Sequence, residues 1–243
     1  MTVKSNLIAM YSVAVSARIN WSKVLFDIKQ MPMVTSIILA SALLAGCSVL
    51  PDKPQRATLF DFGTDLVAPQ ATGSQAQLPA VAIDDIATSG GLLDNSAVLY
   101  RLTYEDAQEL RAYSLSRWTM PAAQLVRQRL RDRLSLSRPV YNARESLALN
   151  RSQNAVLPLQ IRLELQDFSH VFSAPGVSVG LIRLRATLVE VTPAGEKLIN
   201  QRFFVVQRPA PSADAQGGVR ALTAATDAAI VEIEQWLQDS SKR

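Results

Sequence analysis

The segment that decides the fold class is LPLQIRLELQ, residues 157–166. Hydrophobic and polar residues alternate along it: Leu157, Leu159, Ile161, Leu163 and Leu165 alternate with Pro158, Gln160, Arg162, Glu164 and Gln166. A period of two is typical of a β-strand that buries one side and exposes the other. Since proline has no N–H to donate, Pro158 indicates the start of a strand or an edge. The segment therefore predicts a half-buried strand.

The same alternation recurs on both sides of this segment. Upstream, we expect a first strand over 57–62, a second over 80–86 that ends at Thr88-Ser89-Gly90-Gly91, and a hairpin of 98–104 with 110–116. Downstream, residues 182–188 alternate, and the turn Thr192-Pro193-Ala194-Gly195 returns the chain as a partner strand over 197–207. Residues 64–79 are small and polar and predict a surface loop.

Two segments have helical periodicity instead. The first begins near Thr119, a candidate cap, with Pro121 in its first turn, and its apolar stripe is Ala122, Leu125, Val126, Leu130 and Leu134. The second extends from about Asp214 to Leu237 with Ser212 as a candidate cap, and Gly217 and Gly218 are expected to weaken its first turns. We therefore predict an α+β fold: a mixed, largely antiparallel β-sheet with two main amphipathic α-helices packed on it, an α/β sandwich that forms one domain over 57–240.

Composition excludes several function classes. The chain has 243 residues, one cysteine and one histidine, which leaves no cysteine zinc cluster, no internal disulfide and no histidine metal site. The net charge is +4, and residues 1–46 alone carry +3. Because the remainder is almost neutral, we do not expect nucleic acid as a partner. No phosphate-binding glycine loop, G-x-S-x-G or H-E-x-x-H motif occurs, so we predict no catalytic residues, no metal and no cofactor.

The amino-terminal segment has the features of an export signal. An uncharged stretch, VTSIILASALLA over 34–45, follows Lys23 and Lys29 and is too short to span a bilayer. Small residues then precede Cys47, as in a bacterial lipobox, where the cysteine thiol receives a diacylglycerol, the signal is cleaved and the new amino terminus is acylated. The alternative is a buried amino-terminal helix that happens to end in Gly-Cys. We predict a lipoprotein signal peptide over 1–46 and lipidation at Cys47.

The start of translation and the target membrane are separate questions. A leader of 46 residues is long for this class, so Met10, Met31 and Met33 are alternative starts, although a start at Met31 or Met33 would remove both lysines. Ser48 stands where an aspartate would commonly retain a lipoprotein in the inner membrane. We therefore expect the outer membrane, with the domain facing the periplasm and residues 47–56 as a lipidated tether.

Four further groups of residues are candidate sites. Asp84-Asp85 and Glu105-Asp106 are interpreted as polar strand ends and turns, with acid–base catalysis as the alternative. His170 is interpreted as a half-buried strand histidine, since no catalytic or pH-sensing partner is identifiable. Arginines at every second position of the first helix indicate a solvated helix face, with a site for anionic lipid or an acidic partner as the alternative: Arg127, Arg129, Arg131 and Arg133, followed by Arg138. An aromatic cluster indicates core packing, with an exposed binding edge as the alternative: Tyr100, Tyr104, Tyr113 and Trp118.

The order of these features resembles one known family. After the lipobox come Phe60-Asp61-Phe62-Gly63, Val98-Leu99-Tyr100-Arg101, Arg117-Trp118-Thr119-Met120-Pro121, Leu163-Glu164-Leu165-Gln166-Asp167-Phe168 and Pro209-Ala210-Pro211-Ser212-Ala213-Asp214. Together they are similar to the ABC-type transport auxiliary lipoproteins, which include the paraquat-inducible protein C type, over nearly all of 47–240. No single short motif is diagnostic, and only Cys47 carries over as a functional residue.

The resemblance implies a docking component without enzymatic activity. Its partners would be an MCE-domain substrate-binding protein and an ABC permease and ATPase that move lipids or related hydrophobic compounds between the inner and outer membranes, and homo-oligomer rings are one assembly it allows. The alternative is a lipoprotein chaperone or pilotin for an outer-membrane complex. A periplasmic hydrolase is a third hypothesis, which would require a cleft of convergent polar groups.

Overall fold

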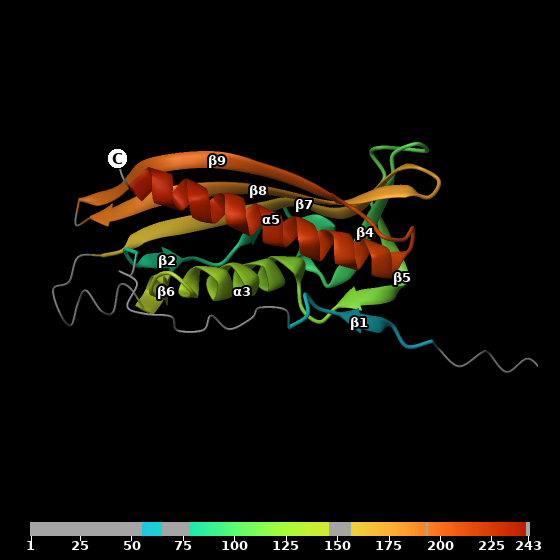
Figure 1. Ribbon diagram of the computed structural model, residues 1–243, viewed down its shortest axis with the longest axis horizontal. Helices are drawn as coiled ribbons and strands as arrows, with labels where there is room; N and C mark the ends of the chain where they lie inside the picture. Colours follow the sequence, from blue (N-terminus) through green and yellow to red (C-terminus); the bar gives the residue numbers. More distant parts are fainter. Residues whose placement is uncertain (1–54, 65–77, 146–156, 193, 242–243) are drawn as a thin grey trace, which may run out of the picture. The chain divides into compact units, whose positions relative to one another are not determined.

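The structure, a computed structural model, describes residues 55–64, 78–145, 157–192 and 194–241. The predictions for the leader, for Cys47, for most of the tether and for most of the 64–79 loop lie outside the described residues. Within them, nine strands form one mixed sheet and two α-helices pack against it (Figure 1), so the predicted α+β fold is confirmed.

The elements follow one another along the described chain with these bounds. The first half contains β1 (Thr58–Phe60), β2 (Val81–Ile83), β3 (Ala87–Thr88), a short 3-10 helix (Gly91–Asp94), β4 (Ala97–Leu102), β5 (Arg111–Trp118) and α3 (Ala122–Ser135). The second half contains β6 (Val140–Asn142), β7 (Leu159–Ala174), β8 (Val177–Thr192), β9 (Gly195–Pro209) and α5 (Ala215–Ser241).

The strand predicted from LPLQIRLELQ is the centre of the sheet. β7 pairs antiparallel with β8 along almost its full length and parallel with β2, β3 and β4. β8 continues antiparallel to β9, and the hairpin of β4 and β5 is antiparallel as predicted. Strand β7 starts at Leu159, so Pro158 stands just before the strand, where it removes no ladder hydrogen bond.

Strand β7 is longer than its sequence pattern predicts because of a β-bulge. Up to Leu165 the odd-numbered residues face the core, and from Phe168 onward the even-numbered ones do. The register with β8 shifts between Leu165 and Asp167, where the extra residue reverses the side-chain phase. The alternation in the sequence therefore ends at Gln166, whereas the strand continues to Ala174.

The second predicted strand is too long. Residues 80–86 contain only β2, and the chain leaves the ladder after Ile83 before β3 forms at Ala87 and Thr88. Both pieces are parallel neighbours of β7. The Asp84 amide N–H still donates to Ile161 O at 3.2 Å, but Asp85 and Ile86 interrupt the strand, and alternation alone does not reveal such an interruption.

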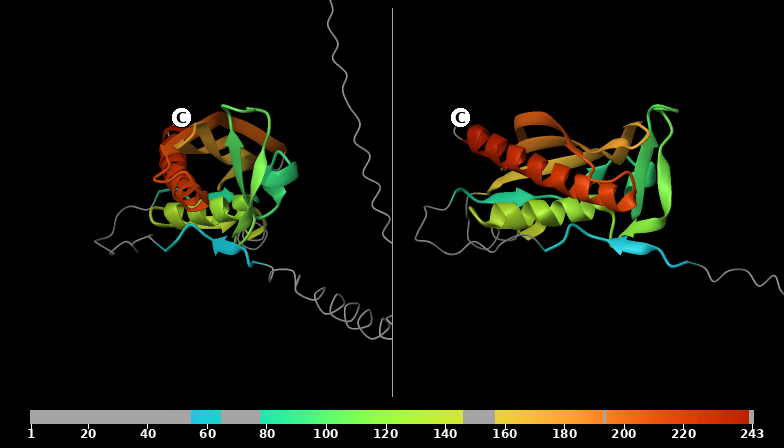
Figure 2. Two further views of the ribbon diagram at one scale, coloured as in Figure 1. Left: turned by 90° about the vertical axis from the view of Figure 1, so that its right-hand side faces the viewer. Right: turned by 45° about the vertical axis from the view of Figure 1, so that its right-hand side comes forward.

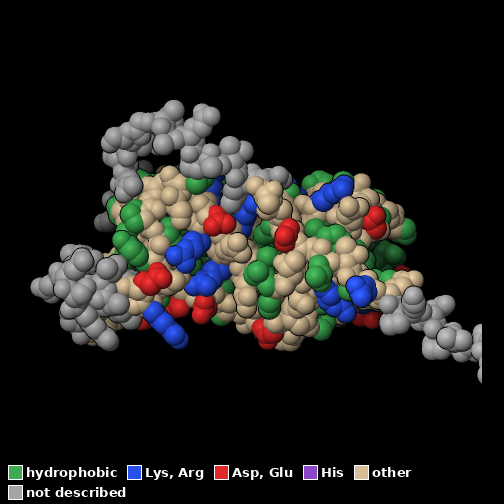
Figure 3. Space-filling view, turned by 90° about the horizontal axis from the view of Figure 1, so that it is seen from below, with side chains coloured by type: hydrophobic (Ala, Val, Ile, Leu, Met, Phe, Trp, Pro, Cys, Tyr) green, Lys and Arg blue, Asp and Glu red, His purple; other side chains and the backbone are tan. Residues whose placement is uncertain are grey.

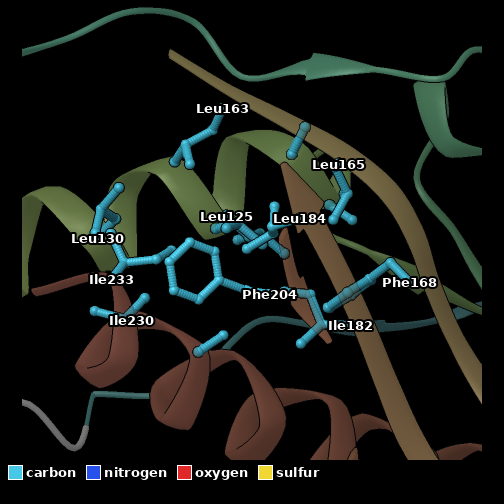
Figure 4. Close-up of a cluster of buried hydrophobic side chains, with 14 of the residues drawn as sticks. Leu125, Leu130, Leu163, Leu165, Phe168, Ile182, Leu184, Phe204, Ile230 and Ile233 are labelled. Carbon is cyan, nitrogen blue, oxygen red and sulfur yellow. The ribbon is translucent and has the colours of Figure 1, made fainter. Parts of the chain in front are cut away.

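Both helices lie on the concave side of the curled sheet (Figure 2). Their apolar stripes meet the inward residues of β7, β8 and β9 in one cluster, where the ring of Phe204 points between side chains of the two helices (Figure 4). All five residues of the predicted α3 stripe are buried. Burial of this continuous apolar surface is the main term that stabilises the fold.

The predicted caps of both helices are wrong in detail. Pro121 is itself the N-cap residue of α3 and no side chain caps this end; the Thr119 N–H donates instead to Phe60 O of β1 at 2.8 Å. At α5, Asp214 Oδ1 accepts from the Gly217 N–H at 2.7 Å, so Asp214 is the cap, and Ser212 donates its hydroxyl to Asp214. Helix α5 also continues four residues past the predicted end, to Ser241.

The glycines near the start of α5 allow close packing. A Cβ on Gly218 would lie 2.5 Å from Nδ1 of His170, and one on Gly217 would overlap the backbone of Ser212. On the sheet, a Cβ on Gly180 of β8 would overlap the backbone of Ala221 and Leu222. The missing side chains therefore bring the first turns of α5 directly onto the sheet, a role that helix propensity does not predict.

Candidate functional site

The adjacent carboxylates form surface ion pairs. Asp84 accepts from Gln160 Nε2 at 3.0 Å and lies 3.7 Å from Arg162 Nε, and Asp85 lies 3.2 Å from Arg127 Nη1. In the other pair, Glu105 lies 3.3 Å from Arg111 Nη1. Each of these three carboxylates faces a guanidinium and not a second carboxylate.

His170 is buried and is held by two hydroxyl groups. Tyr113 Oη lies 2.9 Å from Nδ1, and Ser178 Oγ lies 2.8 Å from Nε2, so both ring nitrogens are hydrogen-bonded. Burial lowers the pKa of His170 to about 4, although the nearby carboxylate of Asp214 acts in the opposite direction. Burial likewise raises the pKa of Tyr113. The imidazole is therefore neutral near pH 7 and is more deeply buried than the half-buried strand position we predicted.

The predicted aromatic cluster divides into two parts. Tyr100 and Tyr113 stack with ring centroids 4.5 Å apart on the β4–β5 hairpin beside His170. Trp118 belongs to the main core, where it contacts Phe62 and Phe168 with centroids at 5.6 Å. Tyr104 is the exposed member of the set. Core packing thus explains Trp118, and the tyrosine pair forms a second contact that supports His170.

The arginines of α3 contact other elements, and one of them, Arg129, is buried. Arg129 is 8% exposed and makes a bidentate pair with Asp227 of α5, with N–O distances of 2.7 and 3.0 Å. One turn later, Arg133 Nε lies 3.1 Å from Glu234 of α5. Arg127 and Arg131 both donate to Oδ1 of Asn142, the last residue of β6. The interpretation as a solvated face is therefore wrong for Arg129, which is buried and paired. The sequence does not reveal this pair, because Asp227 lies 98 residues further along the chain.

Arg138 is also buried, just after α3. It is 5% exposed, and its Nε has no hydrogen-bond partner among the described residues. Burial lowers the pKa of this guanidinium, and Glu234 partly opposes that effect. The carboxylate of Glu234 therefore interacts with two arginines near the carboxyl end of α3, Arg133 and Arg138.

A groove of about 680 Å³ runs along the outer side of α3. Its lining includes the apolar side chains of Ile86, Met120 and Ala123 and the basic side chains of Arg127 and Arg131. Basic, acidic and hydrophobic side chains are interleaved over the face of the molecule that carries α3 (Figure 3). Asp85 forms an ion pair with Arg127, and the carboxylate of Glu145 interacts with both arginines, so the groove offers little free positive charge to an anion.

The outward face of β9 is a feature that the sequence reasoning missed. Phe203 and Val205 are 56% and 54% exposed, and Leu198 is 61% exposed. The signal for it is the unbroken apolar run Phe203-Phe204-Val205-Val206 between Arg202 and Gln207. Such a run predicts a strand buried on both faces, but here only Phe204 and Val206 are buried.

The described residues hold no cluster of histidine, cysteine, aspartate and glutamate that could bind a metal ion. Nor does that part of the chain include a helix with the length and apolarity needed to cross a bilayer. The notable chemistry of the described domain is thus a buried neutral imidazole, an ion-paired junction between helices and an exposed strand.

Comparison with known proteins gives the same fold. The crystal structure of XCC0632 from Xanthomonas campestris, assigned to the DUF330 family, superposes with a TM-score of 0.60 at 17% identity, covering 76% of this chain and 97% of that one. A second, uncharacterized protein gives a TM-score of 0.52 at 11% identity, covering 75% and 99%. The hypothetical protein CT253 from Chlamydia trachomatis gives 0.44 at 9% identity, covering 65% and 95%. At 17% and 11% identity, the likeness to the first two structures establishes the fold alone.

Sequence comparison supplies the family. No curated protein matches this chain significantly. The family model for the ABC-type transport auxiliary lipoprotein component matches residues 60–234, from the end of β1 to the last turns of α5. That range includes every element of the described domain between β1 and α5, and most of α5. The chain therefore belongs to the family of ABC-type transport auxiliary lipoprotein components.

Proposed function

We propose that this lipoprotein is the outer-membrane docking component of an MCE-type ABC transporter that moves lipids or related hydrophobic compounds between the two membranes. The observation that carries the proposal is the family match over 60–234, which begins 13 residues after the only cysteine in the chain. An auxiliary lipoprotein of an ABC transport system needs a membrane attachment and a partner-binding domain, and this chain has a candidate for each.

The proposed mechanism is tethering. Two or three acyl chains on Cys47 would make attachment effectively irreversible, since each buried CH₂ contributes about 0.8 kcal/mol. The ten residues 47–56 can reach at most roughly 35 Å, because an extended chain advances about 3.5 Å per residue. The domain would thus stay within a few nanometres of the membrane, which raises its effective concentration for a partner that reaches there from the other membrane.

Two variants separate the parts of this proposal. Cys47→Ser removes the thiol that would carry the lipid, so we expect a folded, exported protein in the soluble fraction that fails to support transport. Ser48→Asp keeps the thiol and should place the lipidated protein in the inner membrane, where it should also fail. Ser48→Ala is the matched control and should behave as wild type in membrane fractionation and in transport. Full transport by soluble Cys47→Ser protein would refute tethering.

Partner identification tests the transporter assignment directly. Cells would be crosslinked intact, the protein purified through a carboxy-terminal tag, and its partners identified by mass spectrometry. We expect an MCE-domain protein and an ABC permease, and fewer of both from Cys47→Ser cells. Recovery of a secretin or a barrel-assembly protein instead would favour the chaperone or pilotin hypothesis.

A further inference from the structure

Strand β9 is a long edge strand. Among the described residues its only partner in the backbone ladder is β8, over Gly195–Pro209, and it lies at the outer margin of the sheet (Figure 1). Unpaired edges of this length are uncommon on folded proteins, because they can pair with other strands. A short edge, a proline or a bulge would normally block such pairing. In β9 the proline stands at the last position, and the bulge, where Ile199 is the extra residue opposite Leu188 and Val189, lies before the regular stretch 200–209.

The hydrogen-bonding phase shows which residues form the open edge. The Ala210 N–H donates to Ser178 O at 2.9 Å, which makes Ser178 and Ala210 a hydrogen-bonded pair of the antiparallel ladder. Since such pairs alternate and the register is unbroken from Asn200 to Pro209, the even-numbered residues of this stretch bond to β8 and the odd-numbered ones direct their N–H and C=O groups away from it. The backbone of Phe203 and Val205 therefore faces the open edge.

Side chains cover the two ends of this edge and leave its centre open. Asn200 Oδ1 accepts from the Gln201 N–H at 2.8 Å, and Arg208 Nη1 donates to Gln207 O at 2.9 Å. Between them, Phe203 and Val205 combine exposed hydrophobic side chains with exposed backbone groups. An added strand could hydrogen-bond to these backbone groups and pack its side chains against these hydrophobic ones.

The charge around this edge is positive. Arg202 and Arg208 flank its centre, and Arg183 of β8 lies directly beside Val205. None of the ion pairs formed within the described residues includes these three arginines. The guanidinium of Arg202 lies over the Phe204 ring instead, 4.9 Å from its centroid. From Leu198 to Pro209 the strand has no acidic residue, so a second copy of β9 would bring like charges together along the edge.

We propose that the open edge of β9 binds an extended segment of a partner protein as an additional strand, one in which apolar and acidic residues alternate. Its apolar side chains would pack beside Phe203 and Val205 on the outer face of the sheet. Its acidic side chains would lie on the other face, beside Arg202 and Arg208. The inference deepens the proposed docking function and rests on it, because it names the surface that a docking protein uses.

A peptide-binding measurement tests the inference without using the transporter. The full chain, purified in detergent, is titrated with a nine-residue peptide of alternating valine and glutamate, and with a control peptide of alternating valine and lysine. We expect saturable binding of the glutamate peptide and at least tenfold weaker binding of the lysine peptide. Absence of binding, or equal binding of both, would refute the inference. The transporter assignment is judged separately by the crosslinking experiment, so the two can fail independently.

Substitutions on the strand then locate the binding. Val205→Pro removes only an N–H that faces away from β8, so the sheet should survive while peptide affinity falls at least tenfold. Val205→Thr keeps both the N–H and the branched shape, and it should bind as wild type. Equal binding by the two variants would place the peptide elsewhere and overturn the inference.

Charge reversal provides a readout that a folding defect would not produce. In the double variant Arg202→Glu, Arg208→Glu the preference should switch to the lysine peptide. An unchanged preference for the glutamate peptide would overturn the proposed register. Sedimentation of the full chain tests whether a second copy of the protein occupies the edge. A dimer that dissociates in the Val205→Pro variant would assign the edge to a second copy and would overturn the inference.

Discussion

At the scale of single residues, His170 is a neutral imidazole between the hydroxyl groups of Tyr113 and Ser178, with the first turns of α5 packed against its ring. Its Nδ1 and Nε2 can each donate or accept, because both hydroxyls can reverse their roles. The proton that the ring would gain in acid has no carboxylate in contact with it, since Asp214 acts only from a distance. Protonation is therefore opposed mainly by burial.

The first prediction concerns the pH dependence of stability. The folded pKa of His170, about 4, lies below the unfolded value near 6.5, so the unfolded state binds the proton more readily. The contribution of His170 is complete above pH 6.5 and is lost as the pH falls toward 4, by at most about 3 kcal/mol. Urea unfolding of wild type and of His170→Gln between pH 4 and 8 measures it. The two plots of unfolding free energy against pH should differ in slope only between about pH 4 and 6.5. Plots that are parallel throughout this range would contradict the prediction.

The second prediction concerns Gly218. In most helices an alanine in place of a glycine gains about 1 kcal/mol. Here the new Cβ would lie 2.5 Å from Nδ1 and 2.7 Å from Cγ of the buried His170 ring. We expect Gly218→Ala to destabilise the domain by about 1–3 kcal/mol, measured by chemical unfolding. Gln216→Ala, on the exposed side of the same turn, should stay within about 0.5 kcal/mol, and a stabilised Gly218→Ala protein would disprove the close contact.

At the scale of elements, the junction of α3 with α5 is the contact that no local pattern shows. Arginines at every second position look like a solvated row when the helix is considered alone. The tertiary fold places Asp227 and Glu234 of α5 beside two of them, 98 and 101 residues further along the chain. The sequence contains both carboxylates, but neither their spacing nor their neighbours identify the arginines as partners.

The third prediction compares the two ion pairs of this junction. Arg129 is nearly enclosed and bonds Asp227 through two nitrogens, whereas the Arg133 side chain is 43% exposed and bonds Glu234 through Nε. Double-mutant cycles with alanine should give a coupling of about 1–3 kcal/mol for the first pair and under about 1 kcal/mol for the second. Equal couplings would show that burial does not distinguish the pairs.

The elements themselves were largely predictable, and their boundaries less so. Alternation correctly located the hairpin and the three long strands, because a half-buried strand requires it. It failed at the bulge after Leu165, where one extra residue reverses the phase, and at Asp84, where the second predicted strand ends early. The caps failed for a similar reason: Ser212 and Asp214 are equally good caps by type, and only geometry selects Asp214.

At the scale of the whole molecule, the two helices and the sheet share one core. Phe204 of β9 contacts Trp236 of α5 edge to face, with ring centroids 5.9 Å apart, and it belongs to the same cluster as Trp118 and the residues of α3. Among the described residues, most buried hydrophobic side chains of the sheet and of both helices belong to this single cluster. Unfolding should therefore be cooperative.

The fourth prediction tests this shared core. Phe204→Ala should lower the free energy of unfolding by about 3–5 kcal/mol, because it opens a cavity between β9 and both helices. The Trp118→Phe protein keeps Trp236 in the core and the Trp236→Phe protein keeps Trp118, so the fluorescence of the two variants reports on different parts of the core. Each variant should show coincident transitions by fluorescence and by far-ultraviolet circular dichroism. Transitions that separate would indicate two folding units. Phe203→Ala, on the outer face, is the matched control and should cost far less.

By itself, the sequence determined the α+β class, the central strand, the buried helix stripes and the resemblance to the transport auxiliary lipoproteins. These follow from local periodicity and from the order of motifs, which a chain carries without being folded. Only the tertiary structure decided that Arg129 is paired, that His170 is buried and neutral, that Gly218 must lack a side chain and that β9 ends the sheet with an open edge. Each of these depends on contacts between segments far apart in the sequence, and burial and strand order arise only when those segments pack together.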